Sequence, residues 1–228
     1  MRNCWITRYL GKGETVNGTG VIQVLPGASV TIERTTLDGE LGVHACIWDE
    51  GTNLVARGND CMNVNDGIFI WDTDNFTIED NYLHDFTTET ANGHIDAFQT
   101  EGASHGVIRH NTFDVTEGQN ACVAIWNSRA NSDDYLVENN LMAGSGFAVY
   151  AEDYSPSEQS PAGGYSVTNV RFLNNRFSTV HYDCVGSYGV WYPRGNPTDA
   201  WVRTGNVVVE TGESIDSGNP HVNGQLCN

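Results

Sequence analysis

The sequence predicts an all-β fold, a right-handed parallel β-helix (solenoid) of about seven stacked coils with an asparagine ladder. Three observations predict it. A short apolar strand followed by asparagine recurs along most of the 228 residues. β-Branched and aromatic residues fill the repeated units, with Gly, Asn, Asp and Ser between them, and no helical period longer than two turns interrupts them.

The repeat becomes visible when each strand is aligned on the residue that follows it. The anchor residues are, in order, Thr35, Asn59, Asn81, Asn111, Asn140, Asn175 and the looser match Asn206. They lie 24, 22, 30, 29, 35 and 31 residues apart, a spacing typical of one supersecondary unit per repeat. Because parallel strands stack about 4.8 Å apart, we expect the asparagines to line up at one turn and to hydrogen-bond one another's side-chain amides.

Two further columns follow from this alignment. Two positions after each anchor the residue is apolar, which predicts a buried layer formed by Leu37, Cys61, Leu83, Phe113, Met142 and Phe177. Two positions before the anchors, an outward column alternates in sign through Glu33, Arg57, Glu79, Arg109 and Glu138. Opposite charges on neighbouring strands are mildly stabilising. We therefore assign these arginines to the scaffold rather than to catalysis.

The repeat predicts one β-helix domain over residues 1–228, since no linker-like segment interrupts it. Cys4 falls at an anchor position but has no strand before it. We therefore expect the chain to begin inside a coil, which leaves an edge that upstream sequence, a partner or a cap should cover. We also expect the natural protein to be longer.

The charge balance narrows the choice of partners. The formal net charge is −18, with 29 acidic against 11 basic residues, and Lys12 is the only lysine. Nucleic acid is disfavoured as a partner, because binding to phosphates requires positive charge. A polyanionic substrate would need a bridging cation such as Ca²⁺, although an acidic surface can also reflect adaptation to salt. No apolar run approaches the roughly 18 residues of a membrane span, so a membrane partner is not expected.

The cysteines leave two interpretations open. None of them has C-x-x-C spacing, which disfavours a structural zinc site. Their even number is compatible with disulfides, but three of them also lie in apolar strand patterns typical of buried thiols. The six are Cys4, Cys46, Cys61, Cys122, Cys184 and Cys227.

The segments Phe76-Thr-Ile-Glu-Asp-Asn-Tyr-Leu and Gly106-Val-Ile-Arg-His-Asn-Thr-Phe carry a family resemblance. Over about residues 20–210 the chain resembles the pectate-lyase-like right-handed β-helix superfamily. That superfamily includes polysaccharide lyases, glycoside hydrolases, mannuronan epimerases and phage tail depolymerases, so the resemblance is specific for fold and weak for function. It implies a secreted protein with a polysaccharide substrate and leaves the oligomeric state open.

A second strand of each coil carries aromatic residues. Trp48, Trp71, Trp126 and Tyr150 align at one position. Residues of a strand alternate in direction, so these side chains face outward if their apolar neighbours face the core. Outward aromatic rings can stack on sugar rings, and the alternative is that they stack on one another and only add stability.

The segment from Asn92 to Glu101 breaks this alignment. Strict alignment places Asp96 at an inward position, where an unpaired carboxylate is costly. A one-residue bulge would remove the conflict and turn four side chains outward: His94, Asp96, Phe98 and Thr100. Phe98 would then join the aromatic stripe. Bulges are enriched beside active sites, so we expect the catalytic residues here.

His94 and Asp96 would project from one face, about 7 Å apart along the strand, with His44 and Asp66 of the two preceding coils nearby. A histidine beside carboxylates suits general acid and base catalysis on a glycan. The alternative is a His–Asp pair that only holds the bulge. Hydrolysis would instead need two carboxylates that flank the glycosidic bond, and the candidates are Asp72, Asp96 and Glu101.

Two further predictions concern charged groups beside the stripe. Asp72 and Asp74 resemble oxygen ligands for Ca²⁺, and the sequence indicates no other cofactor. Arg194 is the arginine expected nearest the aromatic residues. The predicted substrate-binding set is therefore Trp48, Trp71, Phe98, Trp126, Tyr150 and Arg194, and the predicted catalytic set is His94, Asp96 and Glu101.

Three functions remain open on these grounds, besides epimerisation. The resemblance marginally favours a polysaccharide lyase, which would need His94 or Arg194 as its base, because Lys12 lies outside the predicted groove. A glycoside hydrolase of a neutral glycan, using Asp and Glu, fits the acidic surface better. A non-catalytic glycan-binding or tail-fibre-like module would keep the aromatic residues and lack activity.

Overall fold

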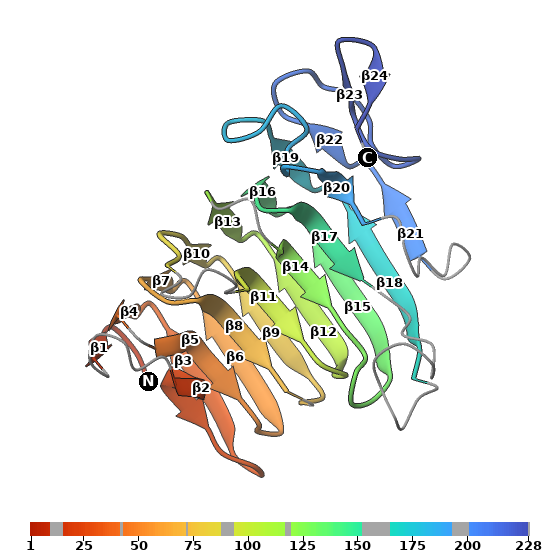
Figure 1. Cartoon of the computed structure of the whole chain (residues 1–228). Helices are drawn as coiled ribbons and strands as arrows, with labels where there is room; N and C mark the ends of the chain where they lie inside the picture. Colours follow the sequence, from red (N-terminus) through yellow and green to blue (C-terminus); the bar gives the residue numbers. More distant parts are fainter. Residues whose placement is uncertain are drawn as a thin grey trace.

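A computed structural model shows a stack of β-coils that rises from the N-terminus to the C-terminus (Figure 1). It describes residues 1–9, 16–41, 43–71, 73–87, 94–116, 120–151, 165–192 and 201–227. Every regular element in these ranges is a β-strand, which confirms the predicted all-β class. The same ranges contain no helix of the length and hydrophobicity that crossing a membrane requires.

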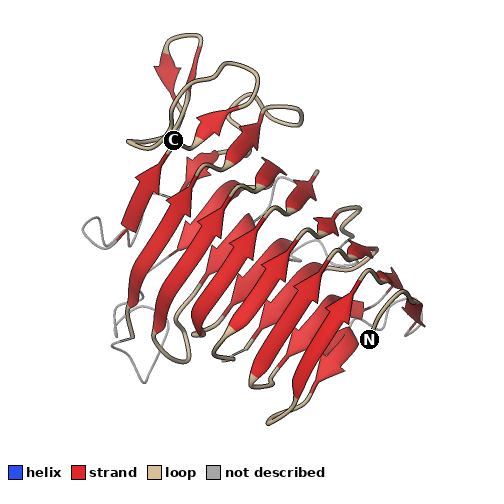
Figure 2. Cartoon of the chain, turned by 180° about the vertical axis from the view of Figure 1, so that it is seen from behind, coloured by secondary structure: helices blue, strands red, loops and turns tan. Residues whose placement is uncertain are grey.

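Three parallel sheets form the walls of the solenoid, and each coil contributes one strand to each sheet (Figure 2). Sheet A contains β3 (Ser29–Glu33), β6 (Asn53–Arg57), β9 (Phe76–Glu79), β12 (Ser104–Arg109), β15 (Ser132–Glu138), β18 (Val167–Leu173) and β21 (Trp201–Thr204). Sheet B contains β1 (Trp5–Tyr9), β4 (Thr36–Leu41), β7 (Asp60–Met62), β10 (Tyr82–Leu83), β13 (Thr112–Val115), β16 (Leu141–Gly144), β19 (Arg176–Ser178) and β22 (Val207–Val208).

Sheet C contains β2 (Val16–Val24), β5 (Val43–Asp49), β8 (Asp66–Ile70), β11 (Asp96–Thr100), β14 (Ala121–Ile125), β17 (Phe147–Ala151) and β20 (Gly189–Trp191). Near the C-terminus, β23 (His221–Val222) and β24 (Gln225–Leu226) form an antiparallel hairpin. The chain therefore runs from sheet A through sheet B to sheet C in each coil, as the predicted right-handed parallel β-helix of about seven coils requires.

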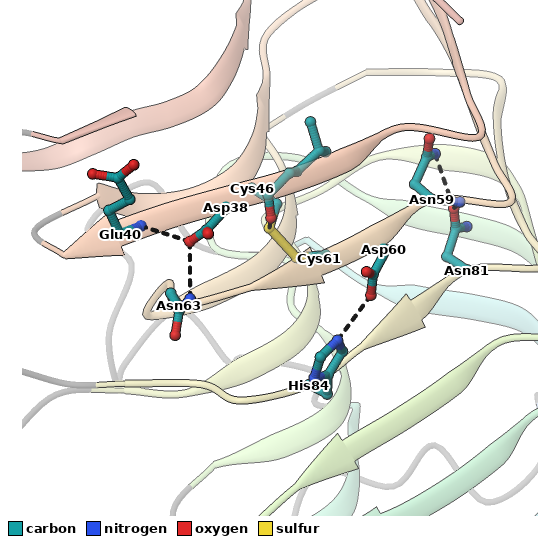
Figure 3. The surroundings of a disulfide bond; sticks show 10 residues. Asp38, Glu40, Cys46, Asn59, Asp60, Cys61, Asn63, Asn81 and His84 are labelled. Carbon is teal, nitrogen blue, oxygen red and sulfur yellow. Dashed lines mark hydrogen bonds and ion pairs between the residues drawn. A yellow bond between two sulfur atoms is a disulfide. The ribbon is translucent and has the colours of Figure 1, made fainter. Parts of the chain in front are cut away.

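The predicted asparagine ladder is confirmed at the turn between sheets A and B. The Nδ2 atom of each ladder asparagine donates to Oδ1 of the next, at 2.9 to 3.0 Å, from Asn59 to Asn206. Figure 3 shows the Asn59–Asn81 step. The same Oδ1 atoms accept the backbone N–H of the preceding anchor, and each Nδ2 also donates to a strand carbonyl. Asp216 ends the ladder by accepting from Asn206 Nδ2 at 2.8 Å.

The residue before each anchor bends the backbone into the left-handed region. These residues have φ between 49° and 74° and are Arg34, Gly58, Asp80, His110, Asn139, Asn174 and Gly205. Glycine, asparagine, aspartate and histidine tolerate this conformation best, because a bulky side chain collides with its own backbone. The turn between sheets A and B thus repeats with the same geometry in every coil.

The predicted buried layer and charged column are also confirmed. Leu37, Phe113 and Phe177 are at most 1% exposed and belong to the core. Outside, Glu79 accepts from Arg57 and Arg109, each at 2.8 Å. Burial opposes ionisation of Glu79, but the two guanidinium groups outweigh it, so the pKa of this carboxyl lies below its ordinary value.

Some of the cysteines form disulfides and others are free thiols. Cys46 of β5 and Cys61 of β7 form a disulfide (Figure 3), and Cys184 and Cys227 form another near the C-terminus. Cys122 is a buried thiol, and burial raises its pKa to about 12. Cys4 is an exposed thiol.

The asparagine ladder predicts that loss of a single side-chain amide lowers the stability of the fold substantially. Asn111→Ala removes the side chain that accepts from Asn81 and donates to Asn140, and the buried backbone N–H of Asn81 and carbonyl of Ile78 lose their hydrogen bonds to it. Each unsatisfied buried group costs about 1 to 3 kcal/mol. We therefore expect a loss of about 3 to 5 kcal/mol in the free energy of unfolding, measured in urea. Asn53→Ala, at an exposed position of β6, is the control and should cost under about 1 kcal/mol.

Candidate functional site

The outer face of sheet C carries two columns of side chains. The strand register aligns Trp48 with Phe69, Phe69 with Gln99, Gln99 with Ala124, and Ala124 with Tyr150. Residues two positions further along form the second column: Glu50, Trp71, Glu101 and Trp126. The prediction that four aromatic residues share one position is therefore wrong. The error arose because the tryptophans were aligned with one another, which shifts neighbouring strands by two residues. Since side chains alternate with a period of two, this shift leaves the predicted outward direction of each side chain unchanged.

The aromatic residues gather in two clusters on this face. Trp48 stacks on Phe69 with ring centroids 4.2 Å apart, and Trp71 packs against both. Further along the solenoid, Tyr150 stacks on Trp126 at 5.9 Å and on Tyr192 at 4.3 Å. Trp48 is nearly buried, whereas Trp71, Trp126 and Tyr150 are half-buried and keep part of their surface exposed.

Glu101 lies between these clusters. Glu101 directly follows β11, which is flanked by β8 and β14, so Trp71 and Trp126 are its neighbours in the second column. Gln99 Nε2 donates to Glu101 Oε1 at 2.9 Å, and the Ser128 hydroxyl donates to Oε2. Burial raises the pKa of Glu101, and the hydrogen bond from Gln99 and the charge of Arg129 oppose it only in part. The surroundings of Glu101 thus favour the protonated form more than water does.

Arg129 is a candidate that sequence reasoning missed. Its guanidinium carbon lies 4.1 Å from the Trp71 ring centroid, and its backbone N–H donates to the Glu101 carbonyl at 3.0 Å. A guanidinium over an indole face is a favourable cation–π contact. The signal that could have found it is its position three residues after Trp126, in the segment that follows β14.

The prediction that Phe98 faces outward is wrong. Phe98 is fully buried, pairs with Ile68 and Val123 of the neighbouring strands, and packs on Phe76 at 5.6 Å. Each of several sheet C strands turns two consecutive residues into the core: Cys46 and Ile47, Ala97 and Phe98, and Cys122 and Val123. This departure from strict alternation thus recurs in several coils, and no bulge distinguishes β11 from the other strands.

Asp96 is also buried, contrary to prediction. Its Oδ1 accepts the backbone N–H of Ala121 at 2.9 Å and its Oδ2 accepts from Asn120 at 3.2 Å, while its own N–H donates to Asp66 Oδ1 at 3.0 Å. Burial first, and the charge of Asp66 second, raise the pKa of Asp96 well above its ordinary value. Asp96 is therefore a buried structural residue, and its carboxyl group is not accessible from the surface.

The histidines are arranged differently from the prediction. His94 is exposed just before β11, its carbonyl accepts from Asn65, and its catalytic role stays a prediction. The His–Asp pair that forms on this face is His44–Asp66, at 2.9 Å. The His44 ring also packs 5.2 Å from Trp48, so the pair borders the first aromatic cluster.

The remaining predicted site residues are the two candidate Ca²⁺ ligands and Arg194. Asp72 and Arg194 lie outside the described residues, and Asp74 is exposed. In the part of the chain that the structure describes, no group of three or more His, Cys, Asp or Glu side chains has a geometry suited to a metal ion. Binding of Ca²⁺ by Asp72 and Asp74 therefore stays a prediction.

Three parallel sheets and an asparagine ladder define a parallel β-helix protein. The family model described as the right-handed β-helix region matches residues 1–142, more than half of the chain. The chain therefore belongs to the right-handed β-helix family. No match was found among curated proteins or among solved structures.

Asp96 predicts a specific dependence of stability on pH. Its pKa is higher in the folded than in the unfolded chain. Its contribution to stability is therefore complete below about pH 4, the ordinary aspartate pKa, and is lost as pH rises through the raised pKa. Asp96→Asn cannot ionise, so the stability of the variant relative to the wild type should increase as pH rises above about 4.

Urea denaturation of both proteins across this pH range measures the difference. Asp74→Asn, at an exposed site, is the matched control and should parallel the wild type. If the difference between wild type and Asp96→Asn stays constant with pH, Asp96 does not carry the raised pKa.

Proposed function

We propose that this protein binds a polysaccharide along the outer face of sheet C and hydrolyses it with Glu101 as general acid. The observation that supports this most is the half-buried Glu101, whose raised pKa favours the protonated form, between Trp71 and Trp126. Carboxylic acids kept protonated by an apolar environment are the usual proton donors of glycoside hydrolases.

The two aromatic clusters support glycan binding on either side of the acid. The half-buried Tyr150 and Trp126 lie on one side, and the half-buried Trp71, with Arg129 over its ring, lies on the other. Sugar rings present apolar C–H faces that pack on such rings, while their hydroxyls bond to polar neighbours. The net charge of −18 favours a neutral glycan over a polyanionic one.

The chemistry needs a second carboxyl group, and Glu50 is the candidate. It lies in the same column as Glu101, two coils away, which places the Cα atoms about 10 Å apart. Inverting hydrolases hold their carboxyl groups about 6.5 to 9.5 Å apart, so that a water molecule fits between sugar and base. Glu101 would protonate the glycosidic oxygen as the bond to the anomeric carbon breaks. Glu50, which accepts from Trp48 Nε1 at 2.7 Å, would take the proton of the attacking water.

A second candidate is β-elimination on a polyuronide, and Arg129 is the observation that favours it. Its guanidinium on Trp71, close to Glu101, could hold the uronate carboxylate and offset the negative charge of the surface.

Secretion is part of both proposals. Two disulfides support it, since disulfides persist in oxidising compartments.

The test is digestion of a panel of neutral and acidic polysaccharides, following reducing ends and the ultraviolet absorbance of unsaturated uronates. Hydrolysis predicts reducing ends without absorbance, and elimination predicts both. Glu101→Gln keeps the shape of the side chain and one oxygen that accepts from Gln99, while its NH2 group donates to the Ser128 hydroxyl instead of accepting from it. The amide cannot donate the proton to the glycosidic oxygen. We expect it to lower turnover by about 100-fold or more while glycan affinity is retained.

Glu138→Gln, on the outer face of sheet A, is the matched control and should retain wild-type turnover. Wild-type turnover by Glu101→Gln would rule out Glu101 as the acid. Binding of a glycan by the wild type without release of any product would identify a binding module instead.

A further inference from the structure

A recess of about 400 Å³ lies at the corner between sheets A and B, the corner to which sheet C does not contribute. Its lining comes from the first coils and consists of Arg2, Glu33, Arg34, Arg57, Gly58 and Asp80. None of these residues belongs to the aromatic face. The recess is therefore separate from the proposed glycan site and does not depend on it.

The shape of the recess follows from one missing side chain. Arg34, Gly58 and Asp80 occupy the same left-handed turn position in three successive coils, with backbone hydrogen bonds that stack the turns. Asn139 and Asn174 hold this position in later coils. At Gly58 no side chain fills the space between Arg34 and Asp80, and a Cβ atom there would lie 3.4 Å from Arg34 Cγ. The surface is hollowed at this coil.

The charge of the lining is opposite to that of the whole chain. Three guanidinium groups face two carboxylates in the recess, whereas the formal net charge of the protein is −18. Arg2 and Arg57 are paired with Glu33, at 3.0 and 3.4 Å. Arg34 donates from Nε to Asn3 Oδ1 at 3.2 Å, and within the described ranges it forms no ion pair with a carboxylate. Arg34 thus supplies a guanidinium that is not engaged in an ion pair among the described residues.

We propose that this recess binds a small sugar acid or a similar hydroxylated carboxylate. Arg34 would hold the ligand carboxylate through charge-assisted hydrogen bonds, for which the guanidinium fork is suited. Asp80 and Glu33 accept hydrogen bonds and would bind its hydroxyl groups. The volume lies within the usual range of about 300 to 1,000 Å³ for small-molecule sites. An inorganic anion would fill only a small part of it.

The test is titration of the ¹⁵N-labelled protein with sodium glucuronate at low ionic strength, following backbone amide signals by NMR. Glucose, which lacks the carboxylate, and sodium sulfate, which lacks the hydroxyls, are the comparison probes. We expect saturable shifts at Arg34, Gly58 and Asp80 with glucuronate, much weaker binding of sulfate, and none of glucose.

Two variants locate the ligand. Arg34→Gln should weaken glucuronate binding by about tenfold or more, the effect of losing one charge-assisted contact. Gly58→Asn should fill the recess and abolish binding. It should also fold normally, because asparagine tolerates positive φ and already occupies the equivalent position at Asn139 and Asn174. Arg176→Gln, an exposed arginine on sheet B outside the recess, is the control and should bind as the wild type does.

Absence of glucuronate shifts at the recess in the wild type would overturn the proposal, as would unchanged affinity in Arg34→Gln or in Gly58→Asn. Equal affinity for sulfate and glucuronate would reduce the recess to a general anion site and contradict the sugar-acid assignment. Equal shifts with glucose would show that the charge of Arg34 plays no part.

Discussion

The asparagine ladder is the interaction on which the rest of this structure depends. From Asn59 to Asn206, each side-chain amide joins its own coil to the next and also satisfies buried backbone groups at the sharpest turn. A buried amide without these partners would be strongly destabilising, so the ladder permits one vertical alignment of the coils. The anchors lie 22 to 35 residues apart, and the variation in length is absorbed at the other two corners.

This alignment fixes what the outer surfaces present. Once the coils are in register, strands of sheet C place Glu101 between Trp71 and Trp126, although 30 and 25 residues separate them in sequence. The same register stacks the left-handed turns, so that one glycine hollows the opposite corner. Both candidate sites are thus consequences of stacking, since no single coil contains either of them.

The parts of the fold that repeat locally could be predicted from the sequence. Asn111, Phe113 and Arg109 stand at fixed offsets within one short segment, so the ladder, the buried layer and the charged column needed no knowledge of neighbouring coils. Placing Phe98 outward failed because it assumed strict alternation, whereas Ala97 and Phe98 both face the core. Asp96 was placed outward because a buried carboxyl was taken to lack partners, yet Asn120 and the Ala121 N–H supply them.

Other features needed the three-dimensional structure. Arg129 lies in a turn, where no periodic pattern indicates its direction, and its contact with Trp71 joins different coils. The Gly58 recess depends on the absence of a side chain between two others that are distant in sequence. The raised pKa of Glu101 depends on its burial. The alternation of a strand predicts burial only for side chains that face inward, whereas Glu101 lies on the outer face.

Glycan binding on sheet C is tested most directly by the tryptophan indole N–H signals that move when an oligosaccharide is added. The probes are xylo-, cello- and galacturonate oligosaccharides, added to ¹⁵N-labelled protein. If the glycan binds between the two clusters, Trp71 and Trp126 shift together along one saturation curve with at least one probe, while Trp5 on sheet B and Trp201 on sheet A stay unchanged. Shifts confined to Trp5 or Trp201, or no shift at Trp71 and Trp126 with any probe, would contradict this mode of binding.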